Sequence, residues 1–321
     1  MYFDFSKAFD RVSHRRLISK MRKLQIDNKT LDWIDNYLTD RKFRVKVNGR
    51  LSSSGSCPSG VPQGSCVGPL LFCIFILDLP DVLPKGIVHK PYADDLKLYT
   101  QCDTPDGRIL LQSAIDAVSK WCEDNEMLIS LPKCAILSSS QHDFVYTLNG
   151  SPVPKARTFR DLGVIISPLL NFDEHITDVV RSCNCICNTI FRCFVVKEPK
   201  FYLTLYNSLV VPKLLYCSEI WRPYLKKHID ALNRVQDRFI RRVCFRCGVA
   251  KESIVLATVA KLHEAADLRM FRKLGRLDIV TKFVNIRVNN LRSGKTISAV
   301  EVPRTERVNN LFSWRMARML R

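Results

Sequence analysis

The chain has 321 residues, which is long enough for two domains that each bury a hydrophobic core. Its 50 Lys and Arg residues outnumber the 31 Asp and Glu residues, so the formal net charge is +19, and 46% of all residues are hydrophobic. This composition excludes a disordered chain and predicts a globular protein that faces a polyanion, either nucleic acid or an acidic membrane surface.

The sequence predicts no membrane-spanning segment, and we expect no membrane partner. The longest apolar run, Pro69 to Leu77, is far shorter than the ~20 residues of a membrane-spanning helix. The opening does not have the pattern of a secretory signal, and 13 cysteines, an odd number, favour free thiols in a reducing compartment. We therefore expect an intracellular protein, nuclear or cytoplasmic, and the sequence does not choose between the two.

The first half of the chain mixes strand and helix patterns. The predicted elements are a strand-like opening within residues 1–10, helices at 13–25 and 29–41, a hairpin at 43–54, a Gly- and Pro-rich loop leading into an apolar helix at 58–72, a hairpin at 87–100, a helix at 105–126, and strands at 135–137, 144–148 and 162–166. The first of these helices places Leu17, Met21 and Leu24 on one face, and Asn48-Gly49 suits a tight hairpin turn.

After about Pro168 the patterns become helical. The predicted helices lie at residues 175–194, 202–221, 226–245 and 263–284. We therefore expect an α+β domain over residues 1–167 and an all-α, basic region over residues 168–321.

Some of the cysteines cluster in two short stretches, which raises the possibility of a zinc-binding module. They are Cys183, Cys185, Cys187 and Cys193 in "CNCICNTIFRC", and Cys244 and Cys247 in "CFRC". The first stretch has a helical pattern, in which residues two apart point away from each other, whereas structural zinc uses two tight pairs on loops. We therefore interpret these cysteines as core residues and expect no structural zinc.

Two adjacent carboxylates, Asp94 and Asp95, stand at the bend of the second predicted hairpin. Because Asp is common in turns, one interpretation is a solvated hairpin tip. The other is a metal site, since Asp4 ends the strand-like opening and could meet that tip. Phosphoryl transfer uses two divalent ions, and Mg²⁺ suits this role because it takes few protein oxygens.

Three blocks of sequence resemble a known family. They are "DFSKAFD" at Asp4–Asp10, "SGVPQGSCVGPLLF" at Ser59–Phe72 and "YADD" at Tyr92–Asp95. In this order and at these spacings they resemble the signature blocks of reverse transcriptases of non-LTR, LINE-type retrotransposons, close to the jockey-like group. "WCEDNEMLISLPKCAIL", "LGVIISPLLNFDEHI" and the run Ser208–Arg242 resemble later blocks, so the likeness covers nearly the whole chain.

The resemblance implies the right-hand fold of polymerases. Residues 1–167 would form a catalytic palm, an antiparallel sheet with packed helices, and residues 168–321 an all-α thumb with a C-terminal basic region. The implied activity is RNA-directed DNA polymerisation, in which deoxynucleoside triphosphates extend the 3′-hydroxyl of a DNA primer on an RNA template. The late arginines, such as Arg238, Arg241 and Arg242, would contact phosphates, with a solvated helix face as the alternative.

The resemblance also implies the catalytic residues. Asp4, Asp94 and Asp95 would hold two Mg²⁺ ions, with Mn²⁺ as a possible substitute. Lys133 matches the lysine that is proposed to protonate or balance the leaving pyrophosphate, and a solvated loop lysine is the alternative. We interpret Asp10 as a residue of a helix start and not as a ligand.

Six further residues are implied to bind the nucleotide and the template. Phe9 matches the aromatic residue that blocks the ribose 2′-hydroxyl, and Gln63 belongs to a loop that lies against the template base and the incoming nucleotide. The full set is Phe9, Gly60, Pro62, Gln63, Gly64 and Tyr92. In that loop Gly60 and Gly64 would allow the backbone to approach closely.

Met1 stands three residues before Asp4. Set against the family pattern, this start leads us to expect an N-terminally truncated copy that lacks the fingers region and the endonuclease domain. Because the fingers would hold the triphosphate, we expect the isolated chain to bind primer–template and to extend it negligibly. The alternative function is that of a catalytically inert, nucleic-acid-binding remnant of such an element.

Overall fold

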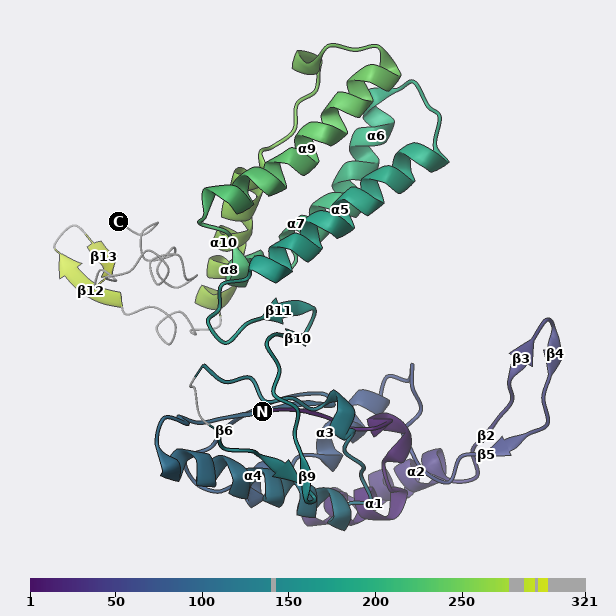
Figure 1. The fold of residues 1–321 in the computed structure, drawn as a ribbon. Helices are drawn as coiled ribbons and strands as arrows, with labels where there is room; N and C mark the ends of the chain where they lie inside the picture. Colours follow the sequence, from purple (N-terminus) through teal and green to yellow (C-terminus); the bar gives the residue numbers. More distant parts are fainter. Residues whose placement is uncertain (140–142, 277–285, 292–293, 300–321) are drawn as a thin grey trace. The chain divides into compact units, whose positions relative to one another are not determined.

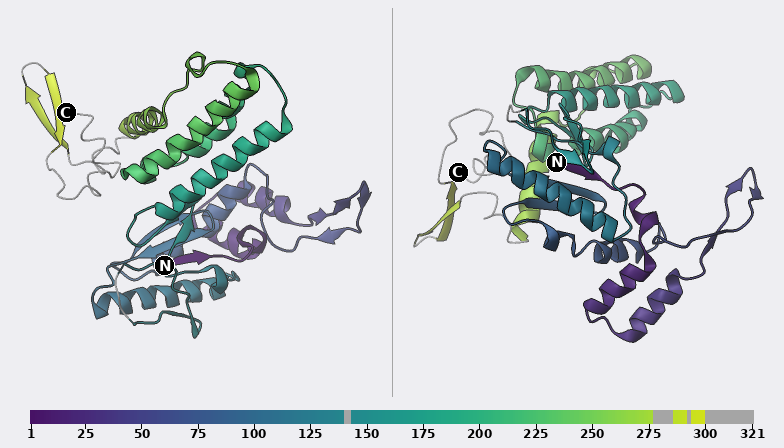
Figure 2. Two further views of the ribbon diagram at one scale, coloured as in Figure 1. Left: turned by 45° about the horizontal axis from the view of Figure 1, so that its top comes forward. Right: turned by 60° about the horizontal axis from the view of Figure 1, so that its bottom comes forward.

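The computed structural model describes residues 1–139, 143–276, 286–291 and 294–299 (Figures 1 and 2). The chain divides into two compact units, Met1–Phe159 and Arg160–Arg321, whereas the sequence predicted a boundary after residue 167. Both helices and strands are present, as predicted. No helix in the described part of the chain is long and apolar enough to cross a lipid bilayer.

The first unit contains a three-stranded antiparallel sheet with the order β1–β7–β6. Its strands are β1 (Tyr2–Asp4), β6 (Val88–Tyr92) and β7 (Asp95–Tyr99). Isolated bridges also pair Tyr2 with Ala135 and Phe5 with Ile129. Because β1 therefore has partners on both sides, its last residue, Asp4, lies in the interior of the layer and not at a free edge.

The predicted helices of the first unit are confirmed. The helical elements are η1 (Ala8–Arg11), α1 (His14–Lys23), α2 (Asn28–Leu38), α3 (Gly68–Phe75), η2 (Leu79–Val82), α4 (Pro105–Asp124) and η3 (Leu131–Lys133). The carboxylate of Asp27 caps α2 by accepting a hydrogen bond from the amide of Thr30 at 2.9 Å. The predicted apolar face of α1 is wrong at Leu24, the C-cap residue, which is 47% exposed.

Short hairpins complete the first unit. Their strands are β2 (Lys42–Phe43), β3 (Lys46–Val47), β4 (Arg50–Leu51), β5 (Gly55–Ser56), β8 (Thr147–Leu148) and β9 (Ser151–Pro152). Strands β2 to β5 form an arm that extends away from the helices of this unit (Figure 2). At its tip Asn48 and Gly49 have φ angles of 48° and 80°, as a tight two-residue turn requires, so the predicted hairpin is confirmed.

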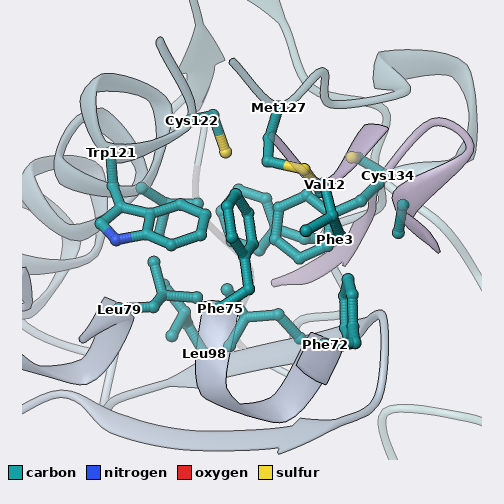
Figure 3. Close-up of a cluster of buried hydrophobic side chains, with 14 of the residues drawn as sticks. Phe3, Val12, Phe72, Phe75, Leu79, Leu98, Trp121, Cys122, Met127 and Cys134 are labelled. Carbon is teal, nitrogen blue, oxygen red and sulfur yellow. The ribbon is translucent and has the colours of Figure 1, made fainter. Parts of the chain in front are cut away.

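The core of the first unit lies between the sheet and the helices α3 and α4 (Figure 3). Phe3 of β1 and Leu98 of β7 are buried with Phe72, Phe75 and Trp121. The rings of Phe75 and Trp121 meet edge to face with their centroids 6.1 Å apart. Since this face of the sheet is filled by apolar side chains, polar residues of β1 and β7 lie on the other face.

A half-buried ion pair ties α1 to the residues around the end of α3. The ammonium of Lys20 donates to Asp78 Oδ1 at 2.7 Å and to the carbonyl oxygen of Phe75 at 2.6 Å. The indole nitrogen of Trp121 donates to the same Asp78 oxygen at 3.0 Å. Burial lowers the pKa of Lys20, although the Asp78 carboxylate opposes this shift. The network holds α1, α3 and α4 in a fixed arrangement under the sheet.

The second unit is mainly helical, but the prediction that it is all-α is wrong. Its elements are β11 (Val164–Ile166), α5 (Asp173–Cys193), α6 (Pro199–Leu205), η4 (Tyr206–Val210), α7 (Val211–Leu215), α8 (Ser218–Trp221), α9 (Lys226–Cys247), η5 (Lys251–Ser253), α10 (Val259–Arg276), β12 (Ile286–Leu291) and β13 (Gly294–Ala299). Strands β12 and β13 pair as an antiparallel hairpin, and β11 pairs with β10 (Phe159–Asp161) at the unit boundary.

Two of the predicted helices differ from the structure. The helix predicted at residues 202–221 is divided, because a π-helical turn at Tyr206–Val210 precedes Pro212, which has no amide hydrogen to donate. The helix predicted at residues 263–284 is confirmed as far as Arg276, and residues 277–285 lie outside the described residues.

Helix α5 carries the first cysteine cluster. Cys183 and Cys187, one turn apart, are buried in the core of the second unit, whereas Cys185 and Cys193 are exposed. Burial raises the pKa of Cys183 to about 12 and that of Cys187 to about 11. These two thiols therefore stay neutral and pack as small hydrophobic groups, which confirms the predicted core role for them. The prediction is wrong for Cys185 and Cys193, which are exposed.

His175, also on α5, is buried in the same unit. Its Nδ1 accepts a hydrogen bond from the amide of Ile165 at 3.2 Å, and its ring meets the ring of Trp221 edge to face at 5.1 Å. Burial lowers the pKa of His175 from 6.5 to about 4. The folded chain therefore holds this imidazole neutral at neutral pH.

This shift predicts a pH-dependent stability. His175 takes up a proton near pH 6.5 in the unfolded chain but only near pH 4 in the folded chain. The contribution of this group to the free energy of unfolding is therefore fully present above pH 6.5 and is lost as the pH drops from 6.5 to 4. We expect a loss of about 3 kcal/mol in urea unfolding between these limits. The variant His175→Gln should show a flatter profile, and an equally flat profile of the unsubstituted chain would contradict the prediction.

Candidate active site

Two of the predicted catalytic carboxylates lie directly opposite each other on neighbouring strands. Asp4 of β1 pairs with Asp95 of β7, and the β6–β7 hairpin pairs Tyr92 with the same Asp95. Cross-strand partners point to the same face of a sheet. Asp4 and Asp95 therefore share the face opposite the buried pair Phe3 and Leu96.

The third carboxylate, Asp94, lies in the turn between β6 and β7. The preceding residue, Ala93, has a φ angle of 50°, in the left-handed region that residues with a Cβ seldom adopt. Asp94 is half-buried, whereas Asp95 and Tyr92 are exposed. The structure thus brings the three predicted metal ligands, Asp4, Asp94 and Asp95, to one end of the sheet.

Lys133 is brought next to the first of these carboxylates. Its ammonium nitrogen lies 3.5 Å from Asp4 Oδ1, and its side chain is 68% exposed. The position follows from the backbone: η3, which ends at Lys133, follows Ser130, whose amide donates to the carbonyl oxygen of Asp4 at 2.8 Å. The segment that pairs with β1 on this side therefore places the positively charged Lys133 beside Asp4.

The Asp4 carboxylate is poorly compensated by the protein. Its Oδ1 is buried and accepts no hydrogen bond from the described residues, since 3.5 Å is an ion-pair distance to Lys133. A buried acceptor without a hydrogen bond is costly, and like charges directly opposite on two strands destabilise a sheet. A second cation near Asp4 and Asp95 would relieve both costs.

These oxygens fit a divalent cation that also binds substrate. Carboxylate oxygens are the ligands that Mg²⁺ prefers, and it commonly takes only one or two of them, together with water and phosphate oxygens. Among the residues that the structure describes, no three Asp, Glu, His or Cys side chains are grouped so that they could hold a metal by themselves. Any cation at this end of the sheet would therefore need further ligands, such as water or phosphate oxygens.

A neighbouring thiol is held neutral. Burial raises the pKa of Cys134, and the charge on Asp4 raises it further, although a backbone hydrogen bond from Asp4 partly opposes the shift. The Cys134 thiol is therefore neutral in the absence of a metal ion.

The predicted loop at Ser59–Gly64 lies against the residues that follow β1. Three hydrogen bonds join the two segments: the amide of Gly60 to the carbonyl oxygen of Val12 at 2.8 Å, the amide of Val61 to that of Phe9 at 2.8 Å, and Ser59 Oγ to that of Asp10 at 2.9 Å. The loop continues into α3, so the site includes parts of all three signature blocks.

Within this loop Gly60 and Gln63 both contact Asp10. Gln63 Nε2 donates to Asp10 Oδ1 at 2.9 Å. Gly60 has a φ angle of 93°, and a Cβ there would lie 2.8 Å from the Cα and from the carbonyl oxygen of Asp10. Pro62 is half-buried, and Gly64, with φ at 80°, faces open space. Close approach of the backbones therefore requires glycine at position 60.

Phe9 is placed between the loop and the core. Its ring stacks on that of Phe72 in α3 with the centroids 4.4 Å apart, and it is half-buried. Packing thus fixes the orientation of the ring and leaves part of it accessible. Its assignment to sugar selection stays a prediction.

Sequence reasoning missed two residues of this region. Asp10, interpreted only as part of a helix start, also accepts the hydrogen bond from Gln63. His14 was not singled out, and its Nε2 donates to the carbonyl oxygen of Gly60 at 2.7 Å. The signal for Asp10 was its place in the first signature block, whereas nothing in the sequence pairs His14 with a glycine 46 residues later.

Residues 1–166 match the family profile of reverse transcriptase (RNA-dependent DNA polymerase), which is just over half of the chain. The chain belongs to the reverse transcriptase family. The resemblance that was inferred from three signature blocks is thereby confirmed.

Two relatives from Drosophila melanogaster extend the similarity beyond this match. The RNA-directed DNA polymerase from mobile element jockey is 28% identical over 258 residues, which cover 75% of this chain and 28% of the relative. The probable RNA-directed DNA polymerase from transposon X-element is 28% identical over 265 residues, which cover 76% of this chain and 28% of the relative. The predicted likeness to jockey-like elements is confirmed, and the chain spans about 28% of the length of these relatives.

A solved structure of telomerase from Candida albicans, in complex with a fragment of telomeric RNA, is also similar. It is 13% identical, and the match covers 85% of this chain and 47% of that chain with a TM-score of 0.31. At this TM-score the comparison does not define the fold, and family membership rests on the sequence match.

Proposed function

We propose that this chain contains the catalytic palm of an RNA-directed DNA polymerase and that residues 168–321 form a thumb that holds nucleic acid. The observation that carries the proposal is the register of β1 and β7, which sets Asp4 opposite Asp95 beside the half-buried Asp94. The partners would be an RNA template, a DNA primer and deoxynucleoside triphosphates. Membership of the reverse transcriptase family supports this choice of chemistry.

We propose that Asp4, Asp94 and Asp95 bind two Mg²⁺ ions, which Mn²⁺ could replace. When bound, the ions would activate the primer hydroxyl and neutralise the triphosphate. Asp4 and Asp94 would be the main residues that hold the ions, and Asp95 would contribute a weaker ligand. Lys133, which lies beside Asp4 and is 68% exposed, would balance negative charge on the leaving pyrophosphate.

The loop and Phe9 would position the nucleotide. Gln63 would lie against the template base and the incoming nucleotide, with its side chain orientation set by Asp10. Gly60, Pro62 and Gly64 would shape the loop backbone, and Tyr92 would stand at the edge of the hairpin. The stack on Phe72 would hold Phe9 rigidly enough to exclude a 2′-hydroxyl.

Primer extension tests the proposed function. The chain is placed in a chimaera in which it replaces the aligned part of the jockey polymerase, and the chimaera is given an RNA template with an annealed DNA primer. We expect extension that requires Mg²⁺ or Mn²⁺ and stops with EDTA, because the triphosphate must be neutralised and the primer hydroxyl activated.

Binding of primer–template, measured in EDTA, is the matched control. A chimaera that folds and binds as the parent polymerase does, but extends no primer in either metal, would favour the inert, nucleic-acid-binding remnant. Extension without any divalent ion would contradict the proposed role of the carboxylates.

Sugar selection gives a second test in the same chimaera. In Phe9→Ala the accepted proportion of ribonucleotides is expected to rise by about tenfold or more, because the ring that blocks the 2′-hydroxyl is gone. The measurement is the ratio of ribonucleotide to deoxynucleotide incorporation. Since Phe9 also packs on Phe72, an equal loss of both reactions would mean that only the packing was disturbed.

A further inference from the structure

A groove of about 730 Å³ is lined by α5 and α9 in the second unit. The side chains that α9 contributes include Arg238, Arg241, Arg242, Phe245 and Arg246. Their spacing places them along one face of the helix, next to the face that is buried against α5. The groove therefore runs between two helices, and every residue that lines it belongs to α5 or α9.

The groove is strongly cationic. Four of its lining residues are arginines and none is acidic. The nearby Asp237 is paired with Lys251 at 3.8 Å. Within the described part of the chain, the guanidinium of Arg238 makes no hydrogen bond or ion pair, and that of Arg241 makes only a long hydrogen bond of 3.4 Å to a backbone oxygen. Two guanidiniums thus remain available for an anionic partner.

The other two arginines fix the shape of the groove. The Arg242 guanidinium lies 4.3 Å above the ring centre of Phe191 and donates to Asn188 Oδ1. Arg246 donates to the carbonyl oxygens of Phe191 and Phe194, at the end of α5. These contacts hold α9 against α5, so the groove is formed before any partner arrives.

An aromatic ring stands among these cations. Phe245 is 92% exposed, although it lies between two arginines that are held in place. Proteins that bind single-stranded nucleic acids commonly interleave aromatic rings with arginines, because each unpaired base can stack on a ring while its phosphate contacts a guanidinium. A duplex keeps its bases stacked on one another and offers Phe245 no such partner.

We propose that this groove binds single-stranded RNA, with one base stacked on Phe245 and adjacent phosphates on Arg238 and Arg241. Asn184 and Asn188 line the opposite wall. The Asn184 amide can donate to and accept from base edges or the 2′-hydroxyl, and the amide nitrogen of Asn188 can donate while its Oδ1 accepts from Arg242. The inference rests on the proposed function in one respect: the RNA would be an unpaired part of the template.

Fluorescence anisotropy with the 321-residue chain tests this inference. The probes are a short oligouridylate, an abasic strand of equal length and a blunt RNA–DNA duplex, all in EDTA so that catalysis plays no part. Phe245→Ala should weaken oligouridylate binding by about tenfold and leave the other two probes unchanged. Phe245→Tyr, which keeps an aromatic ring at this position, should bind oligouridylate as tightly as the unsubstituted chain does. Arg238→Gln and Arg241→Gln should weaken binding to all anionic strands, each lowering the salt slope by about 0.7.

Arg234→Gln is the matched control, because Arg234 is exposed on the same helix but does not line the groove. It should leave oligouridylate binding unchanged, and circular dichroism should show that every variant is folded. Unchanged binding in Phe245→Ala, or an equal loss on the abasic strand, would overturn the inference. Competition by polyglutamate as effective as that by RNA would also overturn it, in favour of an acidic protein. Failure of primer extension would leave the assay unaffected.

Discussion

Replacing Asp94 with asparagine in the chimaera is expected to lower Mg²⁺-dependent primer extension by about 10³-fold or more. The half-buried Asp94 follows the strained Ala93 in the β6–β7 turn, so its side chain is held in place. An amide of the same size keeps the shape of the turn but removes the charge that would hold the cation. The rate of extension at saturating nucleotide is the measurement.

Asp32→Asn is the matched control, because Asp32 is an exposed aspartate on α2. It should retain full activity. Asp94→Asn should bind primer–template as tightly as the unsubstituted chimaera does, since the change touches the metals and not the strand. Retention of more than about a tenth of the activity would contradict a metal-holding role for Asp94.

Asp4→Asn separates catalysis from stability. Its activity should fall as far as that of Asp94→Asn. Without metal, however, the variant should be more stable by about 0.5 kcal/mol, because it removes one of two like charges that face each other across β1 and β7. Lys133 remains nearby and reduces this gain. A loss of stability in the absence of metal would show that repulsion between Asp4 and Asp95 is already compensated within the protein.

Local patterns in the sequence predicted most of the elements but not the pairing that forms the site. The β6–β7 hairpin could be predicted because its two strands alternate and adjoin the same turn. The pairing of Asp4 with Asp95 joins residues 91 positions apart, and periodicity contains no information about such a partner. The position of Asp4 at the end of a strand-like stretch raised a shared metal site with the hairpin tip as one possibility, and the family resemblance assigned both residues to one site.

Two details that the sequence missed depend on where a helix ends and on what a loop contacts. Helix α1 ends at Lys23, and Leu24 at its C-cap is exposed although its spacing from Leu17 and Met21 fits the apolar face. Likewise the contact of Gln63 with Asp10 depends on a loop that folds back onto η1. A glycine-rich segment can be predicted as a loop, but the segment that it contacts cannot be predicted from its composition.

The second prediction with a large effect concerns Gly60, whose backbone lies against Asp10 in the same loop contact. In Gly60→Ala the new Cβ would lie 2.8 Å from the Cα and from the carbonyl oxygen of Asp10, which are backbone atoms that cannot rotate away. We expect a loss of about 3 kcal/mol or more in urea unfolding, from backbone strain at positive φ together with overpacking. We also expect primer extension to fall steeply, because a shift of η1 would move Phe9 and Asp10.

Gly64→Ala is the matched control for Gly60→Ala. Gly64 also has a positive φ, at 80°, but a Cβ there would meet nothing within 4 Å. Its replacement should therefore cost only the backbone term, about 1 kcal/mol, and should leave the path of η1 unchanged. If the two alanine variants lose equal stability, close approach to Asp10 is not what requires glycine at position 60. If only Gly60→Ala loses much stability and activity, the contact between the loop and η1 is what holds Phe9 in position.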